Sequence, residues 1–371
     1  MSFTYWENIK SDKLRLLRSS ESNTLGLCFE LVTIPRNRAP PYTAVSYTWG
    51  TGSRSETIYL NGRSFKIRTD LWNCLYYLGY STPIGSSPIW VDAICINQND
   101  DDERSAQVRS MGQTYSEAAF VSVWLGLPHE HGTLSLIRGS FLNHGGFCWS
   151  GHILELASRS YWTRFWVVQE FLLNENVRLY CGGSHIELSD FEFLLDEATG
   201  TSPLAYSSLL STGKTYDPDG QDFDSIPALA LVETRRKSLY FRQSSSSSSS
   251  SSLQDLLEHH RRSRCGDQRD RVFSLLALVP SEEQEILRKF FPDYSLSIDQ
   301  VLIITLAHLI QQARRKDLTR VSLVSYDIFT GLGVDPSLTS RARLLEKARK
   351  VGDLRNENDN IEFLAELGIK D

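Results

Sequence analysis

A single glutamate inside an apolar helical segment is the strongest chemical signal in this sequence. Glu170 lies in the run 162–173, which is apolar around nearly the whole circumference of a helix and therefore must be buried on most sides. Trp166 precedes Glu170 by one helical turn, so an aromatic ring shares its face. A carboxylate in such surroundings is costly unless it is paired, opens onto a polar cleft or binds a proton. Two interpretations stay open: a salt bridge to an arginine such as Arg164 or Arg104, or a catalytic carboxylate at the mouth of a groove.

Further polar residues follow the segments predicted to be buried strands. The alternating segment 43–49 and the nearly continuous apolar run 89–96 both read as strands of a sheet. In open parallel sheets, ligands bind beyond the carboxyl ends of the strands. The sequence therefore predicts one cleft lined by Ser46, Trp49, Gly50, Asp92, Asn97, Gln98 and Arg104.

The elements around these residues alternate between strands and helices. The segments 56–60 and 63–67 flank Asn61-Gly62, which predicts a small β-hairpin with a type I′ turn. A helix is expected from 69 to 80, and another from Asp100 to about residue 118, with Asp100 and Glu103 as a capping box.

The second half of this region continues the alternation. We expect a strand over 120–126, a helix over 151–174 and a strand over 177–181. The order predicts an α/β fold, a parallel sheet flanked by helices with the small hairpin as an insertion.

Nine consecutive serines divide the chain, because such a polar tract cannot bury apolar surface and is expected to form a linker. The sequence after it is expected to be mostly helical, with the apolar series 301–310 as the core face of one helix. We therefore predict five parts: an N-terminal extension (1–41), the α/β domain (42–182), a connecting region (183–243), the serine linker (244–252) and a helical C-terminal region (253–371).

Composition excludes several classes of protein. The 371 residues include 45 acidic and 39 basic side chains, and the net charge of −6 gives no general attraction for nucleic acid. The six cysteines form no CxxC pair, so a zinc ribbon or a disulfide scaffold is not expected. No window approaches the ~18 apolar residues of a membrane span, and no leader sequence is recognisable, so we expect a cytoplasmic protein.

Three other signals favour ordinary structural roles. His129-Glu130-His131 lacks the helical spacing of a metal pair, so no metal is expected. The basic stretch 259–264 reads as a solvated helix end rather than an RNA or phosphate site, because acidic residues follow closely. Arg269-Asp270-Arg271 is interpreted as an ion pair at a helix start.

Four ordered blocks carry a specific resemblance. Together they resemble the signature of the fungal heterokaryon incompatibility (HET) domain, and they cover residues 42–50, 90–98 with Glu103, Arg104 and Met111, 119–126 and 164–170. Two later stretches, 269–278 and 292–295, resemble segments that follow this domain in longer family members. The serine tract and the C-terminus depart from the family pattern.

The resemblance implies a cytosolic effector that arrests growth or triggers programmed cell death when genetically different fungal cells fuse. It also implies a remote relation to the TIR domain, a flavodoxin-like fold of innate immunity. In NAD-cleaving TIR domains a glutamate lies in a Trp-x-x-x-Glu pattern, and the segment from Trp166 to Glu170 is similar to it.

This relation suggests NAD⁺ as a substrate, with no further cofactor. Cleavage of the nicotinamide–ribose bond requires a carboxylate that stabilises an oxocarbenium-like ribose, a role for Glu170. Trp49 or Trp166 would stack on a base, and Arg104 would bind pyrophosphate, with Arg164 among the substrate-binding residues. The alternative is a non-enzymatic module that self-associates, responds to an upstream recognition protein and recruits other death effectors.

Overall fold

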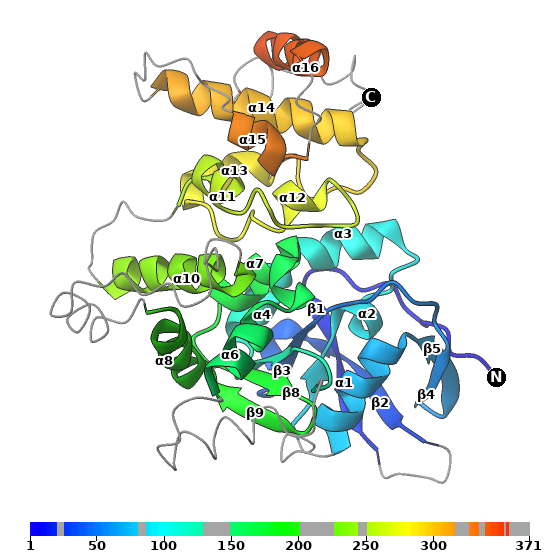
Figure 1. Ribbon diagram of the computed structural model, residues 1–371. Helices are drawn as coiled ribbons and strands as arrows, with labels where there is room; N and C mark the ends of the chain where they lie inside the picture. The colour runs from blue at the N-terminus through cyan, green and yellow to red at the C-terminus, as the bar shows by residue number, and fades with distance from the viewer. Residues whose placement is uncertain are drawn as a thin grey trace, which may run out of the picture. The chain divides into compact units, whose positions relative to one another are not determined.

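A computed structural model describes residues 1–20, 26–80, 87–128, 149–200, 226–243, 251–315, 326–333, 338–351 and 354–355 (Figure 1). Contacts between Cα atoms divide the chain into two compact units. Unit 1 comprises Met1–Gln98, Thr114–Thr163 and Glu170–Arg235, and unit 2 comprises Asn99–Gln113, Arg164–Gln169 and Arg236–Asp371. This division differs from the expected parts, since two pieces of the expected α/β domain belong to the unit that contains the C-terminal region.

Unit 1 is built on a mixed sheet with the strand order β5-β4-β2-β1-β6-β3-β7-β8-β9. The strands are β1 (Lys13–Ser19), β2 (Cys28–Pro35), β3 (Thr43–Tyr47), β4 (Glu56–Leu60), β5 (Arg63–Ile67), β6 (Ile89–Trp90), β7 (Phe120–Trp124), β8 (Val177–Cys181) and β9 (Ser184–Glu187). The neighbours β6, β3, β7 and β8 run parallel, as does the pair β2 and β4, while the other pairs are antiparallel. The predicted α/β class is confirmed, but the prediction of a parallel sheet holds only for the neighbours β6, β3, β7 and β8 and for the pair β2 and β4.

The N-terminal segment contributes to this sheet. The strands β1 and β2, which lie in the segment expected as an extension, pair over seven residues, and β1 also pairs with β6. The predicted hairpin of β4 and β5 is confirmed, and its turn residues Asn61 and Gly62 have φ of 50° and 74°. These two positive angles are those of a type I′ turn.

The predicted strand over 89–96 is wrong beyond its first two residues. The chain is extended at Ile89 and Trp90 and then forms a short helix, α2 (Asp92–Cys95). The carboxylate of Asp92 accepts a hydrogen bond from the backbone N–H of Ala93, at 2.7 Å, so it supports the start of this helix. A continuous apolar run does not distinguish a buried strand from a buried helix, which explains the error.

Two predicted helices are interrupted. The expected helix after Asp100 is split at Ser110 into α3 (Asp101–Arg109) and α4 (Met111–Glu117). The Asp100 side chain accepts a hydrogen bond from the N–H of Glu103, which confirms Asp100 as the N-cap of α3. The expected helix over 151–174 consists of α6 (Trp149–Ala157), a 3-10 turn (Ser160–Thr163) and α7 (Phe165–Leu172).

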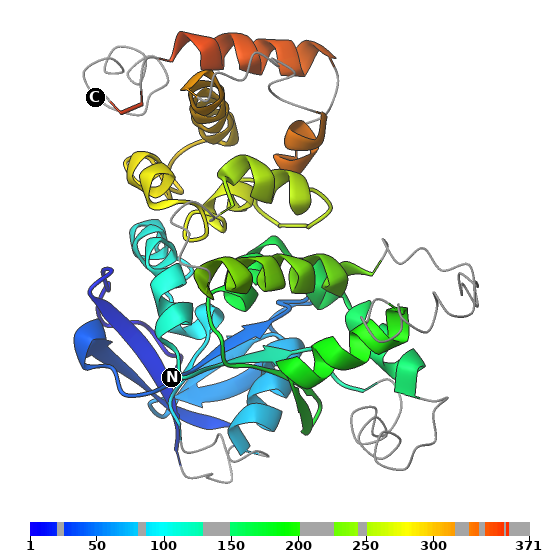
Figure 2. The same cartoon turned by 90° about the vertical axis from the view of Figure 1, so that its left-hand side faces the viewer.

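Helices cover both faces of the sheet in unit 1, namely α1 (Thr69–Tyr80) on one face and α10 (Pro227–Gln243) on the other (Figure 2). The helix α8 (Leu188–Thr199) follows β9 and contacts it. Tyr77 of α1 stacks on Trp124 of β7, with ring centroids 5.6 Å apart. Ser46 is in register with Val123 of β7, and since side chains alternate along a strand, these two residues lie on the face opposite Trp124.

Unit 2 is helical in the part of the chain that is described, as predicted for the C-terminal region. Its helices are α11 (Leu253–His259), α12 (Asp270–Phe273), α13 (Ser281–Leu287), α14 (Ile298–Arg315), α15 (Tyr326–Gly331) and α16 (Leu338–Lys350), together with α3. The apolar series 301–310 is buried along α14, which confirms it as a core face. Residues 244–250 of the predicted serine linker lie outside the described residues, whereas Ser252 caps α11 through a capping box with Asp255.

Within the described ranges, none of the helices combines the length and the hydropathy that a membrane crossing requires.

We predict that Gly50→Ala destabilises the protein, with Gly52→Ala as the control. Gly50 has φ of 66°, and an added Cβ would lie 2.0 Å from Oδ2 of Asp70. The left-handed backbone alone costs an alanine about 1–2 kcal/mol, and displacement of Asp70 adds to this. A Cβ on Gly52 meets no atom within 4 Å. Urea unfolding of the two variants measures the difference, and equal stabilities would contradict the expectation.

Candidate functional site

Glu170 is buried in unit 1, where it is hydrogen-bonded to a serine that in turn bonds to a tyrosine. Its side chain is 1% exposed, and its Oε2 accepts a hydrogen bond from Oγ of Ser46. Ser46 is also 1% exposed, and its Oγ lies 2.6 Å from the hydroxyl oxygen of Tyr161. With the Ser46 proton donated to Glu170, Tyr161 is the donor in this second bond. The prediction that Glu170 lies at the open mouth of a groove is therefore wrong for this conformation.

Three elements bring this polar cluster together. Ser46 is the penultimate residue of β3, Tyr161 lies in the 3-10 turn after α6, and Glu170 lies in α7. The contact between Ser46 and Glu170 thus lies at the carboxyl end of a central parallel strand, the position at which open parallel sheets bind ligands. Nothing in the local pattern around Tyr161 marks it as a partner of Ser46, since it lies in a short turn between Ser160 and Trp162 with no recognisable motif.

A buried arginine anchors the end of α7 that carries Glu170. Arg235 of α10 is 3% exposed and donates hydrogen bonds to the carbonyl oxygens of Phe171, Asn174 and Glu175, at 2.5, 2.7 and 3.0 Å. A guanidinium in this position satisfies the carbonyls that a helix leaves unpaired at its C-terminus and interacts favourably with the helix dipole. Arg235 lies in the expected connecting region, and the sequence alone did not single it out.

A second cluster of predicted residues lies around Asp92. Trp49 Nε1 donates to Asp92 Oδ2 at 2.9 Å, and Gln98 Nε2 donates to the Asp92 carbonyl oxygen, also at 2.9 Å. The three side chains are partly exposed, as is Asn97. Gly50 lies beside the carboxylate of Asp70, a residue that was not among the candidates. Trp49, Asp92 and Gln98 thus form a hydrogen-bonded network of partly exposed residues.

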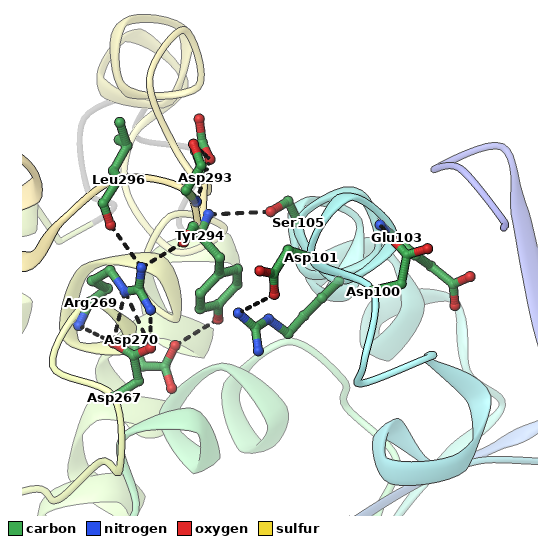
Figure 3. Close-up of polar contacts among 12 residues, drawn as sticks. Asp100, Asp101, Glu103, Ser105, Asp267, Arg269, Asp270, Asp293, Tyr294 and Leu296 are labelled. Carbon is green, nitrogen blue, oxygen red and sulfur yellow. Dashed lines mark hydrogen bonds and ion pairs between the residues drawn. The ribbon is translucent and has the colours of Figure 1, made fainter. Parts of the chain in front are cut away.

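A third cluster lies in unit 2 around Asp270 and Tyr294, which Figure 3 shows, and two predicted residues, Arg104 and Trp166, contact it. The Tyr294 hydroxyl donates to Asp270 Oδ1 at 2.7 Å, and the Trp166 side chain also hydrogen-bonds to this carboxyl. Arg104 pairs with Asp101 at 2.9 Å, and its guanidinium lies 4.1 Å from the centroid of the Tyr294 ring. Arg104 and Trp166 therefore interact with side chains of the protein itself, and these contacts account for their positions without a bound pyrophosphate or base.

Burial and charge shift the pKa values in this cluster. Desolvation raises the pKa of Asp270 to about 6, against the hydrogen bonds from Tyr294 and Trp166, which lower it. Burial also acts to raise the pKa of Asp267, but the hydrogen bonds and the charge of Arg269 outweigh it and hold that pKa below its ordinary value. Asp267 and Arg269 form an ion pair at 2.6 Å, so the ion pair predicted near residue 270 involves Asp267 instead.

Arg164 precedes α7 and contributes backbone contacts. It forms an isolated β-bridge with Arg264, and the N–H of the next residue, Phe165, donates to the Arg264 carbonyl at 2.8 Å. Of the two arginines considered as partners of Glu170, Arg104 pairs with Asp101, and Glu170 accepts a hydrogen bond from Ser46.

The candidates thus separate into a buried cluster, a surface network and a cluster in unit 2. Asp270 and Tyr294 are not among the predicted site residues, although both lie in stretches, 269–278 and 292–295, that resemble segments of longer family members. Groups of three or more metal-ligating side chains do not occur among the described residues, and the pair His129 and His131 lies outside them.

We predict that Ser46→Ala lowers the free energy of unfolding by about 1–3 kcal/mol, because it deprives a buried carboxylate of a hydrogen-bond donor. Ser55→Ala is the matched control, since Ser55 donates to Glu56 at 3.2 Å on the exposed surface and should contribute less than about 0.5 kcal/mol. Urea unfolding compares the two variants. A double-mutant cycle with Glu170→Gln assigns the loss to this pair, and additive effects would contradict the assignment.

We also predict that Asp270 makes stability depend on pH. Its pKa of about 6 in the folded state exceeds the ordinary value of 3.8, so between these values the folded state binds more protons. The Asp270 contribution is complete below about pH 4 and is lost as the pH rises through about 6. Asp270→Asn should therefore flatten the fall in unfolding free energy over this window, whereas the exposed Asp299→Asn should keep it. Identical profiles for wild type and Asp270→Asn would refute the shift.

Comparison with known proteins finds a family match in the first half of the chain. Residues 42–144 match the family model described as heterokaryon incompatibility protein (HET). A relative from Neurospora crassa, heterokaryon incompatibility protein 6, OR allele, is 39% identical over 107 residues, which span 26% of this chain but only 16% of the relative. No solved structure matches. The family resemblance predicted from the ordered blocks is therefore confirmed, and the HET domain match of this chain lies between residues 42 and 144.

Proposed function

We propose that this protein acts in fungal heterokaryon incompatibility, as a cytoplasmic effector that arrests growth or triggers programmed cell death on non-self recognition. The observation that carries the proposal is the HET match over 42–144, together with 39% identity to a protein named for heterokaryon incompatibility. The composition agrees, because a net charge of −6 gives no reason to assign the chain to nucleic-acid binding.

The mechanism that fits the described conformation best is a signalling module that self-associates and recruits other effectors. The side chain of Glu170 is 1% exposed, and Ser46 occupies one of its oxygens. A catalytic carboxylate must come within hydrogen-bond distance of its substrate, and this one is in contact with the protein itself. Recognition of an upstream protein would then change the association state rather than a reaction rate.

NAD⁺ cleavage is the second candidate, and one feature favours it. A carboxylate and two hydroxyls, those of Ser46 and Tyr161, converge at the carboxyl end of a central parallel strand. If the chain opened there, Glu170 would be free to stabilise an oxocarbenium-like ribose, and the two hydroxyls would be placed to bind ribose oxygens. This mechanism rests on a TIR-like architecture, which is part of the proposal, and on an opening that breaks the Ser46–Glu170 bond.

One preparation distinguishes the two mechanisms. The purified full chain, alone and clustered by a fused oligomerisation module, is incubated with NAD⁺, and nicotinamide release is measured for wild type and Glu170→Gln. Because Glu170 is buried, we expect no release above the Glu170→Gln background in either state. In fungal cells, we expect growth arrest by both proteins.

Glu155→Gln is the control variant, since Glu155 pairs with Arg159 at 2.8 Å, away from the Ser46–Glu170 contact. Nicotinamide release by the clustered wild type that persists in Glu155→Gln and is lost in Glu170→Gln would reject the signalling module and establish the enzyme. Normal growth of cells expressing the wild type would contradict the role in incompatibility itself.

A further inference from the structure

The first residues of α7 pair with a segment from much later in the chain. Arg164 and Arg264 form a parallel β-bridge, and the N–H of Phe165 donates to the Arg264 carbonyl oxygen at 2.8 Å. A helix leaves its first N–H groups without partners inside the helix, so this carbonyl satisfies one of them. We call residues 264–274, which contain α12, the α12 segment. Residues 164–169 and the α12 segment both belong to unit 2.

Two side chains of α7 hydrogen-bond to the α12 segment. The Trp166 side chain hydrogen-bonds to the carboxyl group of Asp270. Gln169 is 2% exposed, and in the amide orientation that gives both of its atoms a partner it donates to the Ser274 carbonyl oxygen at 3.0 Å and accepts from the Gly112 N–H at 3.2 Å. Trp166 and Gln169 are three positions apart and therefore lie on the same face of α7. This face is bonded to the α12 segment at two points.

A cation of the α12 segment contacts the same end of α7. The guanidinium carbon of Arg271 lies 5.2 Å from the centroid of the Phe165 ring, which is fully buried. A cation at this distance is attracted to the face of an aromatic ring. Nη1 of Arg271 also donates to the Gly331 carbonyl oxygen at the end of α15, at 2.8 Å, so the position of the guanidinium is fixed from a second side.

The α12 segment has further contacts that do not involve α7. Arg269 pairs with Asp267 at 2.6 Å and donates to the carbonyl oxygens of Tyr294 and Leu296, both at 2.7 Å (Figure 3). The Tyr294 hydroxyl donates to Asp270 at 2.7 Å. These bonds remain when a contact to α7 is removed, so the segment keeps attachments of its own. The attachment to α7 can therefore be tested separately from the folding of the segment.

The attached end of α7 leads directly to the buried carboxylate. Glu170 follows Gln169 in the sequence, and its carboxylate accepts the hydrogen bond from Ser46. Successive residues of a helix are linked by one hydrogen-bonded backbone, so a displacement of the first residues of α7 moves Glu170 as well. Contacts that hold residues 165–169 in place thus also favour the enclosed position of Glu170.

From these contacts we propose that the α12 segment is autoinhibitory: it holds α7 in the resting conformation, and its release from α7 activates the protein. The inference rests on the proposed function for the meaning of activation, which is growth arrest. Both mechanisms proposed above need such a step, because each starts from a conformation in which Glu170 is enclosed. An upstream protein would favour the released state by binding it more tightly than the resting state.

A purely structural role for the same contacts makes a different prediction. If they only stabilised unit 2, their loss would weaken α7 and the other helices of the unit alike, and growth arrest would not become stronger. A restraint on α7 instead predicts that α7 opens locally and that arrest needs less protein. Local opening is measured by the exchange of backbone amide hydrogens.

The first test follows hydrogen exchange by mass spectrometry in the purified full chain at neutral pH. Trp166→Phe removes the indole N–H and keeps an aromatic ring, and Gln169→Leu removes the amide bonds. In each variant we expect the amides of α7 to exchange at least about tenfold faster than in wild type, because each loses a buried or charge-assisted hydrogen bond. The amides of α14, in the same unit, should exchange as in wild type.

Trp49→Phe is the matched control, since it removes another indole–carboxylate bond, from Trp49 to Asp92 at 2.9 Å, outside the α12 segment. It should leave the exchange of α7 unchanged. Wild-type exchange of α7 in both Trp166→Phe and Gln169→Leu, or equal acceleration in α7 and α14, would overturn the proposal.

The second test measures growth arrest in fungal cells that express the full chain at graded, matched abundance. We expect Trp166→Phe and Gln169→Leu to arrest growth at an abundance roughly tenfold lower than wild type, because a larger fraction of each variant is in the released state. Equal arrest by the variants and wild type, with α7 opened in the exchange experiment, would overturn autoinhibition and leave the proposed function intact. Normal growth with all three proteins at every abundance would contradict the proposed function and the regulatory role together.

Discussion

The structure depends on the cost of placing a carboxylate in an apolar environment. Such a group must receive hydrogen bonds from its surroundings, because the water that would solvate it is excluded. The run that contains Glu170 is apolar, so the donor comes from elsewhere in the chain: Ser46 at the end of β3. This requirement fixes α7 against the central strand, and Tyr161 completes the arrangement by bonding to Ser46.

The same requirement acts in unit 2. Asp270 is satisfied by the hydroxyl of Tyr294 and by the Trp166 side chain, and burial still raises its pKa to about 6. Trp166 and Glu170 are one turn apart on α7, so each of the two carboxyl clusters takes one residue from this helix.

For function, these contacts change the meaning of the Trp-x-x-x-Glu pattern. In the sequence, this pattern suggests an aromatic ring and a carboxylate that face the same substrate. In the structure, the Trp166 side chain hydrogen-bonds to Asp270, and Glu170 accepts a hydrogen bond from Ser46. The pattern also lies beyond the residues that match the HET family, which end at 144. The proposed role in incompatibility rests on the matched region.

Several elements of the fold could be predicted from the sequence, because they depend on interactions between residues that are close in the chain. The Asn61-Gly62 turn, the Asp100 cap and the helix from Thr69 to Tyr80 follow from backbone preferences and nearby hydrogen bonds, and the ordered blocks identified the family. Only the tertiary structure decided that Asp92 begins a helix and that Glu170 is enclosed, because a hydrophobic run shows that a segment is buried without showing what it packs against. The partner that satisfies a buried charge is brought by the fold from a distant part of the chain, as Ser46 is brought to Glu170, and no local pattern contains that information.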